Sequence, residues 1–283
     1  MTDHNYVTVL PAGEDTGGVL AIAGAELTQN LQTCLPSPEP GLSCLIHVNA
    51  LFLPAAAAGS LRVPNAGLQR LDLFAQAIAV TTAHGGVAQI NHPNFHYAAD
   101  AFLLTKLVRK GVRFIEVANE SADANNAGDA KHPSTEALWD EVLTSGADVW
   151  GVATDDAHHY DDAEVLRAEH QPVFTGDRGF VMVRAPAEPG AIRAAMLRGD
   201  FYASSGVMLA RAERRADGTM VVEVAPNAGE SHRIQCIGNG GEIVGESSGP
   251  IGGCASPTPG RYMRAVVTDS QGRHAWLQPV RGR

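Results

Sequence analysis

The sequence has four cysteines, three lysines and no long hydrophobic run. Its longest apolar stretches, such as Leu51–Ala58 and Ala75–Val80, fall far short of the roughly 20 residues that a helix needs to cross a bilayer. A membrane span and a membrane partner are therefore not expected. The opening residues, Met1–Asn5, carry neither a basic region nor an apolar core, so they do not resemble a signal peptide.

The cysteines are few for a chain of 283 residues, and they lie at positions 34, 44, 236 and 254. Their spacings match no zinc knuckle, and their number does not suit a disulfide framework. We expect four reduced thiols in a cytoplasmic protein, with a Cys34–Cys44 bridge as the open alternative.

Positive charge is also scarce, since 21 basic residues against 31 acidic residues give a net charge of −10. An acidic chain repels a phosphate backbone, which argues against long nucleic acids as partners. Hydrophobic residues make up 45% and charged residues 18% of the chain, as is usual for a globular protein with a buried core.

The first two thirds of the chain alternate between helical and strand patterns. Helices are expected at 68–83, 99–110 and 134–145, and short apolar strands at 87–91, 112–117 and 149–154. Ser134 has the position of an N-cap, and His84 that of a C-terminal cap. This alternation predicts parallel βα units.

The pattern changes after residue 206. Short β-like runs follow at 207–211, 220–224, 233–237, 262–268 and 275–280, separated by turn residues. They predict a small antiparallel β-sandwich-like domain at 207–283, after a first domain at 1–206. The stretch 245–260 is rich in Gly, Ser and Pro and is expected to be a loop.

Histidines and carboxylates recur where the predicted strands end, in the sequence order Asp3, His4, Glu26, His47, His92, Asp156 and His158. Imidazole and carboxylate together suit Zn, Mn or Fe, and two or three such ions can activate water and hold a phosphoryl group. Asp156 and His158 lie two residues apart, so on an extended segment both side chains point the same way.

Other polar residues have plainer interpretations. A structural role is expected for His84, His132, His170, His232 and His274, while His96 and His159 lie near the expected site and stay undecided. Strand-end hydrogen bonding is one reading of Glu116 and Asn119. Arg178 could contact a phosphate, although solvation at the surface is the favoured interpretation.

Taken in order, these segments resemble a known superfamily. Its successive motifs are similar to Thr2–Asn5, Gly24–Thr28, His47, Gly85–Gly86 with Asn91–Pro93, Ile115–Val117 with Asn119, and Thr154–His158. The superfamily is that of the PHP (polymerase and histidinol phosphatase) domains. The branch of predicted metal-dependent phosphoesterases related to the CehA/McbA proteins is favoured by Leu138–Asp140 and by Ala275–Pro279.

The resemblance covers about residues 2–206 and implies a distorted (β/α)7 barrel with up to three divalent metal ions. It implies that Glu26, His47 and His92 hold one ion. Glu26 would bridge to a second ion held by Asp156, and a third would lie between His4 and His158, with Asp3 beside them. Metal-activated water would attack phosphorus, and the residues expected to assist are His4, Asp156 and His158.

The superfamily's first motif, a strand that ends in His-x-His, has no counterpart before Thr2. Either the native protein starts upstream of Met1, or the protein is genuinely shortened. We therefore expect an N-terminally incomplete barrel with fewer than three metal ions. The predicted function is hydrolysis of a small-molecule phosphoester. A carboxylic or carbamate ester hydrolase and a degenerate metal-binding pseudoenzyme are the alternatives, and a homo-oligomer is left open.

Overall fold

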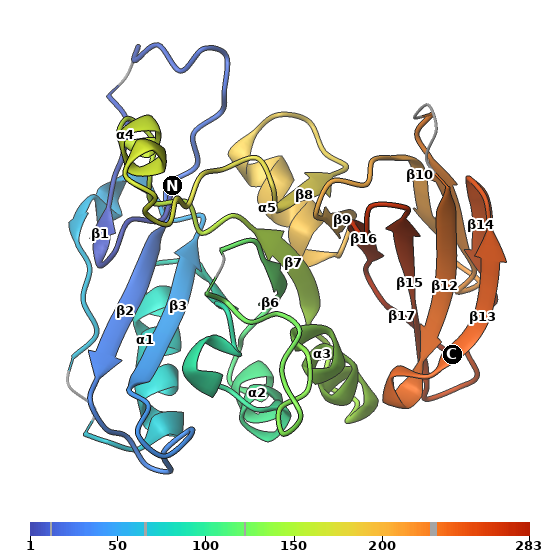
Figure 1. The fold of residues 1–283 in the computed structure, drawn as a ribbon, viewed down its shortest axis with the longest axis horizontal. Coiled ribbons are helices and arrows are strands. Elements are labelled where there is room, and N and C mark those ends of the chain that lie inside the picture. The colour runs from blue at the N-terminus through green and yellow to red at the C-terminus, as the bar shows by residue number, and fades with distance from the viewer. Residues whose placement is uncertain (12, 65–66, 122, 227–230) are drawn as a thin grey trace.

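The computed structural model describes residues 1–11, 13–64, 67–121, 123–226 and 231–283. A five-stranded sheet with its helices forms one end of the long axis, and antiparallel strands form the other end (Figure 1). A two-stranded ribbon pairs β1 (Tyr6–Val7) with β4 (Gly59–Ser60). Short 3-10 turns complete the described chain at Ala55–Ala57, Phe95–Tyr97 and Asn239–Gly241.

The five-stranded sheet is mixed and has the order β2-β3-β5-β6-β7. Its first three strands pair antiparallel, and its last three pair parallel. Apolar residues predominate in β3, β5, β6 and β7, because both faces of the sheet are covered over much of their area, whereas β2 is more polar. The strands span Ala25–Leu31, Cys44–Leu51, Val87–Ile90, Phe114–Asn119 and Trp150–Thr154.

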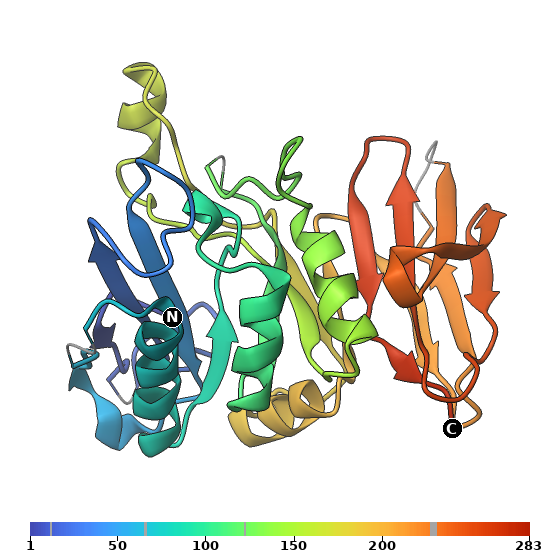
Figure 2. The same ribbon diagram turned by 90° about the horizontal axis from the view of Figure 1, so that it is seen from below.

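Three helices lie side by side on one face of this sheet (Figure 2). They are α1 (Arg70–Ala83), α2 (Ala101–Arg109) and α3 (Thr135–Thr144), which confirms the three helices expected from the sequence. The Ser134 side chain accepts a hydrogen bond from the Ala137 N–H, as an N-cap should. His84 is the C-cap of α1, and its Nδ1 lies 2.9 Å from the Val80 carbonyl oxygen.

The opposite face of the sheet is divided into an apolar and a polar part. Met196 of α5 (Pro189–Leu197) packs with Phe114 and Val152 over the apolar part. Asn49, Gln89 and Glu116 are buried polar residues of neighbouring strands. The short helix α4 (Ala163–Ala168) projects away at the edge of this end of the molecule (Figure 1).

The remaining strands form two antiparallel sheets that enclose a second core. The larger sheet has the order β13-β12-β15-β16-β9-β8, with β17 also on β15, and the smaller has the order β10-β11-β14. Side chains of both sheets pack together between them, among them Val222, Ile234 and Val267. Strands β8 to β17 span, in this order, Phe180–Val183, Phe201–Ser204, Leu209–Arg214, Met220–Val224, His232–Gly238, Ile243–Ser248, Ile251–Cys254, Tyr262–Asp269, His274–Leu277 and Val280–Arg281.

The loop predicted at 245–260 is wrong in part, because β13 and β14 occupy half of it. Two of its glycines, Gly252 and Gly253, lie where strands come into close contact. A Cβ on Gly252 would lie 2.3 Å from Ser247 Oγ, and one on Gly253 would lie 2.4 Å from the Met220 carbonyl oxygen. Glycine is therefore required for strands to approach at these two positions.

The predicted fold class is wrong, because the incomplete (β/α)7 barrel that was expected before the β-sandwich-like domain is not present in the described residues. The described residues are mostly β-sheet with five short helices, and they form no closed barrel. Such a barrel needs parallel strands joined by helical crossovers, whereas β2, β3 and β5 pair antiparallel. At the other edge of the sheet, the Gln278 side chain accepts a hydrogen bond from the Gly151 N–H and donates one to the Gly151 carbonyl oxygen. It thus pairs with β7 as a neighbouring strand would.

The expected division at residue 206 stays a prediction, although β8 and β9 precede it and pair into the C-terminal sheet. The two ends of the molecule are also joined by a buried ion cluster. Arg264 of β15 contacts Asp140 and Glu136 of α3, and Ile237, Tyr262 and Trp276 share a core with the helices.

The expectation of four reduced thiols is wrong, because Cys34 pairs with Cys44 and Cys236 with Cys254. Sequence spacing gave no sign of the second pair, since β12 and β14 come together only through the packing of the two sheets. Such bonds are typical of oxidising compartments, so the cytoplasmic location is not supported. Within the described ranges, no helix has the length and apolar character needed to span a bilayer.

Candidate metal centre

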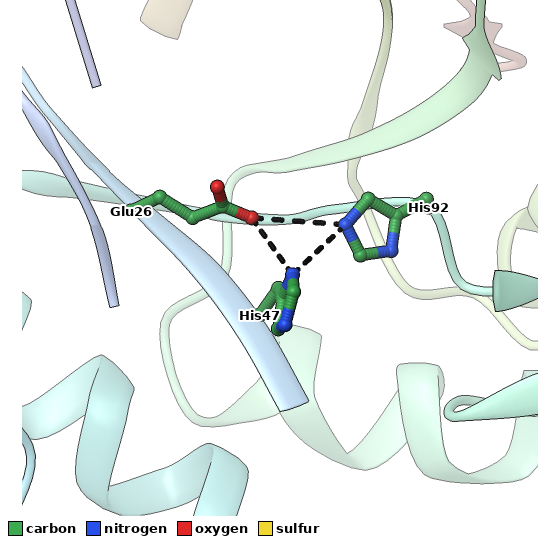
Figure 3. Close-up of side chains that lie close together, drawn as sticks. All are labelled: Glu26, His47 and His92. Carbon is green, nitrogen blue, oxygen red and sulfur yellow. Dashed lines mark hydrogen bonds and ion pairs between the residues drawn. The ribbon is translucent and has the colours of Figure 1, made fainter. Parts of the chain in front are cut away.

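Glu26, His47 and His92 come together in a buried triangle (Figure 3). Glu26 Oε1 lies 2.9 Å from His47 Nδ1 and 3.7 Å from His92 Nε2, and the two imidazole nitrogens are 3.1 Å apart. All three residues are at most 7% exposed. Three lone-pair donors thus face one point inside the protein.

The strand pairing explains this convergence. Glu26 is the second residue of β2 and His47 is central in β3, where it is the register partner of Thr28. His92 lies two residues after Ile90, the last residue of β5, which is the next strand in the sheet. Its backbone has the unusual φ of 23°, and its N–H donates to Glu116 Oε2 at 2.6 Å. That bond holds the turn that directs the imidazole toward Glu26.

The charges of the triangle stabilise one another. Burial alone would raise the pKa of Glu26, but the hydrogen bonds and charges of His47 and His92 hold it well below its usual range. Burial alone would lower the pKa of His92, but Glu26, Glu116 and Asp156 raise it to about 9. Burial lowers the pKa of His47 despite its contact with Glu26. The cluster therefore holds a carboxylate that attracts positive charge.

Three amide side chains that the sequence analysis did not assign to the site hold its residues in place. Asn30 Oδ1 lies 2.7 Å from His47 Nε2, which leaves Nδ1 facing Glu26. Asn91 donates to Glu26 Oε1 at 3.0 Å. Asn119, for which hydrogen bonding was one interpretation of the sequence, donates to Asp156 Oδ2 at 3.1 Å. Partners of this kind orient metal ligands in proteins. Asn91 and Asn119 lie in segments that resemble the PHP motifs, whereas the sequence gave no signal for Asn30.

Glu116 of β6 contacts the backbone of His92 and is 2% exposed. Its carboxyl accepts hydrogen bonds from Gln89, Thr154 and Asn119, in addition to the His92 N–H. Burial raises its pKa to about 7, against the opposing effect of His92. It organises the backbone around His92 and does not belong to the triangle.

The other predicted ligands lie around the triangle but are not part of it. Asp156 Oδ2 is 3.9 Å from His92 Nε2, and His4 Nδ1 is 3.2 Å from Glu26 Oε2. His4 and His158 stack with ring centroids 5.5 Å apart, and both are more than 40% exposed. Asp3 is directed elsewhere, because its carboxylate accepts a hydrogen bond from Thr8.

Residues that the sequence left undecided lie outside the triangle. His96 Nδ1 contacts Ser43, and His159 Nδ1 accepts from the Phe174 N–H while its ring stacks on Phe174. The Arg178 N–H donates to Asp155 Oδ1.

Two cavities flank the triangle. One of about 370 Å³ is lined by His47, His92 and Phe95, and one of about 550 Å³ is lined by Glu26, Asn91 and Glu116. His4 and His158 line both. A small molecule can therefore approach the triangle from either side.

The donor set fits a divalent metal ion. Bonds of about 2 Å in tetrahedral geometry place ligand atoms roughly 3.3 Å apart, and the three separations here bracket that value. The buried His92 Nδ1 has no hydrogen-bond partner among the described residues. This group could hold a metal ion. No family model and no curated protein matches the chain.

Proposed function

We propose that the protein is a metal-dependent hydrolase that cleaves a phosphoester. The buried triangle of Glu26, His47 and His92 carries the proposal, because one carboxylate and two imidazoles form a three-ligand set that suits a catalytic divalent ion. The order of these residues in the sequence, which resembles that of the PHP domains, supports it independently.

A bound Zn, Mn or Fe ion supplies Lewis-acid polarisation of a phosphoryl oxygen and activation of water. Glu26, His47 and His92 would hold this ion. Asn30 keeps His47 Nδ1 turned toward the centre, and Asn119 keeps Asp156 beside it. Asp156 offers a carboxylate that can accept a proton from water.

His4 and His158 have the position of proton donors to a leaving alkoxide. Their Nε2 atoms are 3.4 Å apart, and both residues line the two cavities beside the triangle. Imidazole is the side chain that most readily exchanges a proton near neutral pH, so we assign it the transfer to the departing group.

A second candidate is a metal-binding protein without hydrolytic activity. It is favoured by the fact that only one three-ligand group exists among the described residues. Asp3 is turned toward Thr8, and His4 and His158 are largely solvated. Exposed ligands with few supporting partners hold a metal ion weakly.

The test is a hydrolysis assay after chelation and reloading with Zn or Mn. Phosphomonoesters, phosphodiesters and aryl carboxylic esters are compared for wild type and His47→Ala, with His84→Ala as a control outside the site. The proposal expects metal-dependent phosphoester cleavage that is lost only in His47→Ala. Cleavage of carboxylic esters alone would replace it with the ester hydrolase, and metal binding without any cleavage would favour the second candidate.

The two disulfides also bear on where the protein works. We propose that it functions in an oxidising compartment, since structural disulfides persist there and are reduced in the cytoplasm. Mass spectrometry of alkylated protein, taken directly from the producing cells, tests this. The proposal is supported if all four cysteines react with the alkylating reagent only after the protein has been reduced. It is contradicted if all four react without reduction.

A further inference from the structure

A third cavity lies between α5 and the sheet, next to the metal centre. It has a volume of about 350 Å³, and its walls include Leu51, Val152, Ile192 and Met196. This size lies within the range of small-molecule sites, which are mostly apolar with a few polar groups. The four wall residues provide the apolar surface that such a site requires.

This cavity adjoins the 550 Å³ cavity that is lined by Glu26. Asn49 and Thr154 line both of them. Asn49 is the register partner of Glu26 across β2 and β3. A molecule whose reacting group lies at Glu26 can therefore extend past Asn49 into the apolar space.

Asn49 gives this junction a specific chemistry. The residue is 8% exposed, and its buried Oδ1 has no hydrogen-bond partner among the described residues. A buried acceptor without a partner destabilises the fold, so a ligand that supplies an N–H or O–H here relieves that cost. Its neighbour Gln89, by contrast, donates to Asn91 and Glu116.

The rim of the cavity carries a further sign of function. Phe52 lines it with a φ of 58°, a conformation that is rare for a bulky side chain. Strain of this kind concentrates at binding sites, where the surrounding structure enforces it. Phe52 thus lines, in a strained conformation, a cavity that adjoins a metal-ligand cluster.

We propose that this cavity, the alcohol pocket (Leu51, Asn49, Val152, Ile192 and Met196), binds the apolar aromatic or branched alcohol part of the ester. The proposal rests on the proposed hydrolysis. In that reaction the oxygen of water bonds to phosphorus, the bond from phosphorus to the ester oxygen breaks, and a proton passes to that oxygen. The resulting hydroxyl donates to Asn49 Oδ1, while phosphate remains at the metal centre.

The pocket is tested by titrating metal-free protein that carries ¹³C-methyl methionine with phenol and with anisole. Phenol should shift the Met196 methyl signal and leave those of Met220 and Met263 unchanged, because the latter two lie in the C-terminal core. Phenol should bind about tenfold more tightly than anisole, which has no hydroxyl. Asn49→Leu should abolish that difference.

Two variants of α5 complete the test. Ile192→Trp fills the pocket and should weaken phenol binding at least tenfold, whereas Ala194→Trp lies on the exposed side of the same helix and should leave it unchanged. A Met196 signal that does not respond to phenol would overturn the proposal, as would equal effects of the two variants.

This titration uses neither metal nor turnover, so it separates the two proposals. Phenol binding at Met196 without metal-dependent hydrolysis would remove the enzymatic proposal but keep the pocket. Metal-dependent hydrolysis in a protein whose Met196 signal does not respond to phenol would keep the enzymatic proposal and remove the pocket.

Discussion

The molecule contains two buried charged clusters, and they are built in opposite ways. In the Arg264 cluster, Asp140 is held bidentately at 2.7 and 2.6 Å, and Glu136 lies 2.8 Å from the same guanidinium. Each of the four carboxylate oxygens has a donor, since Tyr262 and Trp276 supply two more hydrogen bonds. Opposite charges are therefore paired within the protein itself.

The triangle of Glu26, His47 and His92 instead brings one carboxylate oxygen and two imidazole nitrogens together around one point. Its one carboxylate faces two imidazoles, and His92 Nδ1 has no partner. The carboxylate oxygens of the Arg264 cluster all have donors within the protein, although Arg264 Nη1 is buried without a partner among the described residues. The triangle instead leaves one carboxylate oxygen and two imidazole nitrogens facing a point that a cation can occupy. Comparison of the two clusters distinguishes a structural ion cluster from a candidate ligand site, although both are buried and charged.

The largest effect is expected on breaking the Arg264 cluster. Arg264→Met leaves the charges of Asp140 and Glu136 buried without their partner, which costs about 3–5 kcal/mol of unfolding free energy. Denaturant unfolding measures the loss. Arg211→Met, which removes an exposed pair with Glu213, should change stability by less than about 1 kcal/mol. Equal losses in both variants would refute the structural role of the cluster.

Removal of the Cys236–Cys254 disulfide tests whether the C-terminal sheets and the triangle of Glu26, His47 and His92 are independent of each other. Replacing Cys236 and Cys254 by Ser opens a link across 18 residues and should cost about 3 kcal/mol. Because the link lies in the C-terminal sheets, metal binding at the triangle should be unchanged. Calorimetric titration with Zn checks this, and a large fall in affinity would show that the regions are coupled.

Metal binding should stabilise the protein through the triangle alone. A ligand at 100 times its Kd adds about 2.7 kcal/mol to the unfolding free energy, so the melting temperature should rise with Zn or Mn. The rise should vanish in Glu26→Gln and persist in His84→Ala. A Zn-dependent rise of unchanged size in Glu26→Gln would place the metal elsewhere.

The smallest effect concerns pH. Burial alone would raise the pKa of Glu136, but Arg264 and Trp276 lower it below 4.5. A lowered folded-state pKa contributes stability above pH 4.5, which is lost as the pH falls through the folded value. Unfolding free energy measured between pH 6 and pH 3 should therefore fall less steeply for Glu136→Gln than for wild type. Parallel curves would contradict the assignment.

The sequence predicted those elements that local rules determine. Helix α3 follows from the N-cap at Ser134 and from its apolar spacing, and α1 from its stop at His84. Glu26, His47 and His92 were grouped through their order along the chain, and the structure brings them together. Local chemistry and motif order were sufficient for these features.

Most of the failures concern long-range pairing. Nothing local distinguishes an antiparallel β2–β3 pair from strands of a barrel, and the Cys236–Cys254 bond depends on how two sheets pack. The positions of Asn30 and Asn91 beside the triangle depend on the same register. Asp3 was chosen by resemblance, but its hydrogen bond with Thr8 directs it elsewhere.

The central claim, that Glu26, His47 and His92 form a metal site, is tested most directly by metal analysis of dialysed protein. After loading with Zn or Mn and removal of excess metal, we expect one tightly bound ion per chain in wild type and in His84→Ala, and none in His47→Ala. Wild-type protein that retains no ion, or a His47→Ala variant that retains as much metal as wild type, would contradict the account.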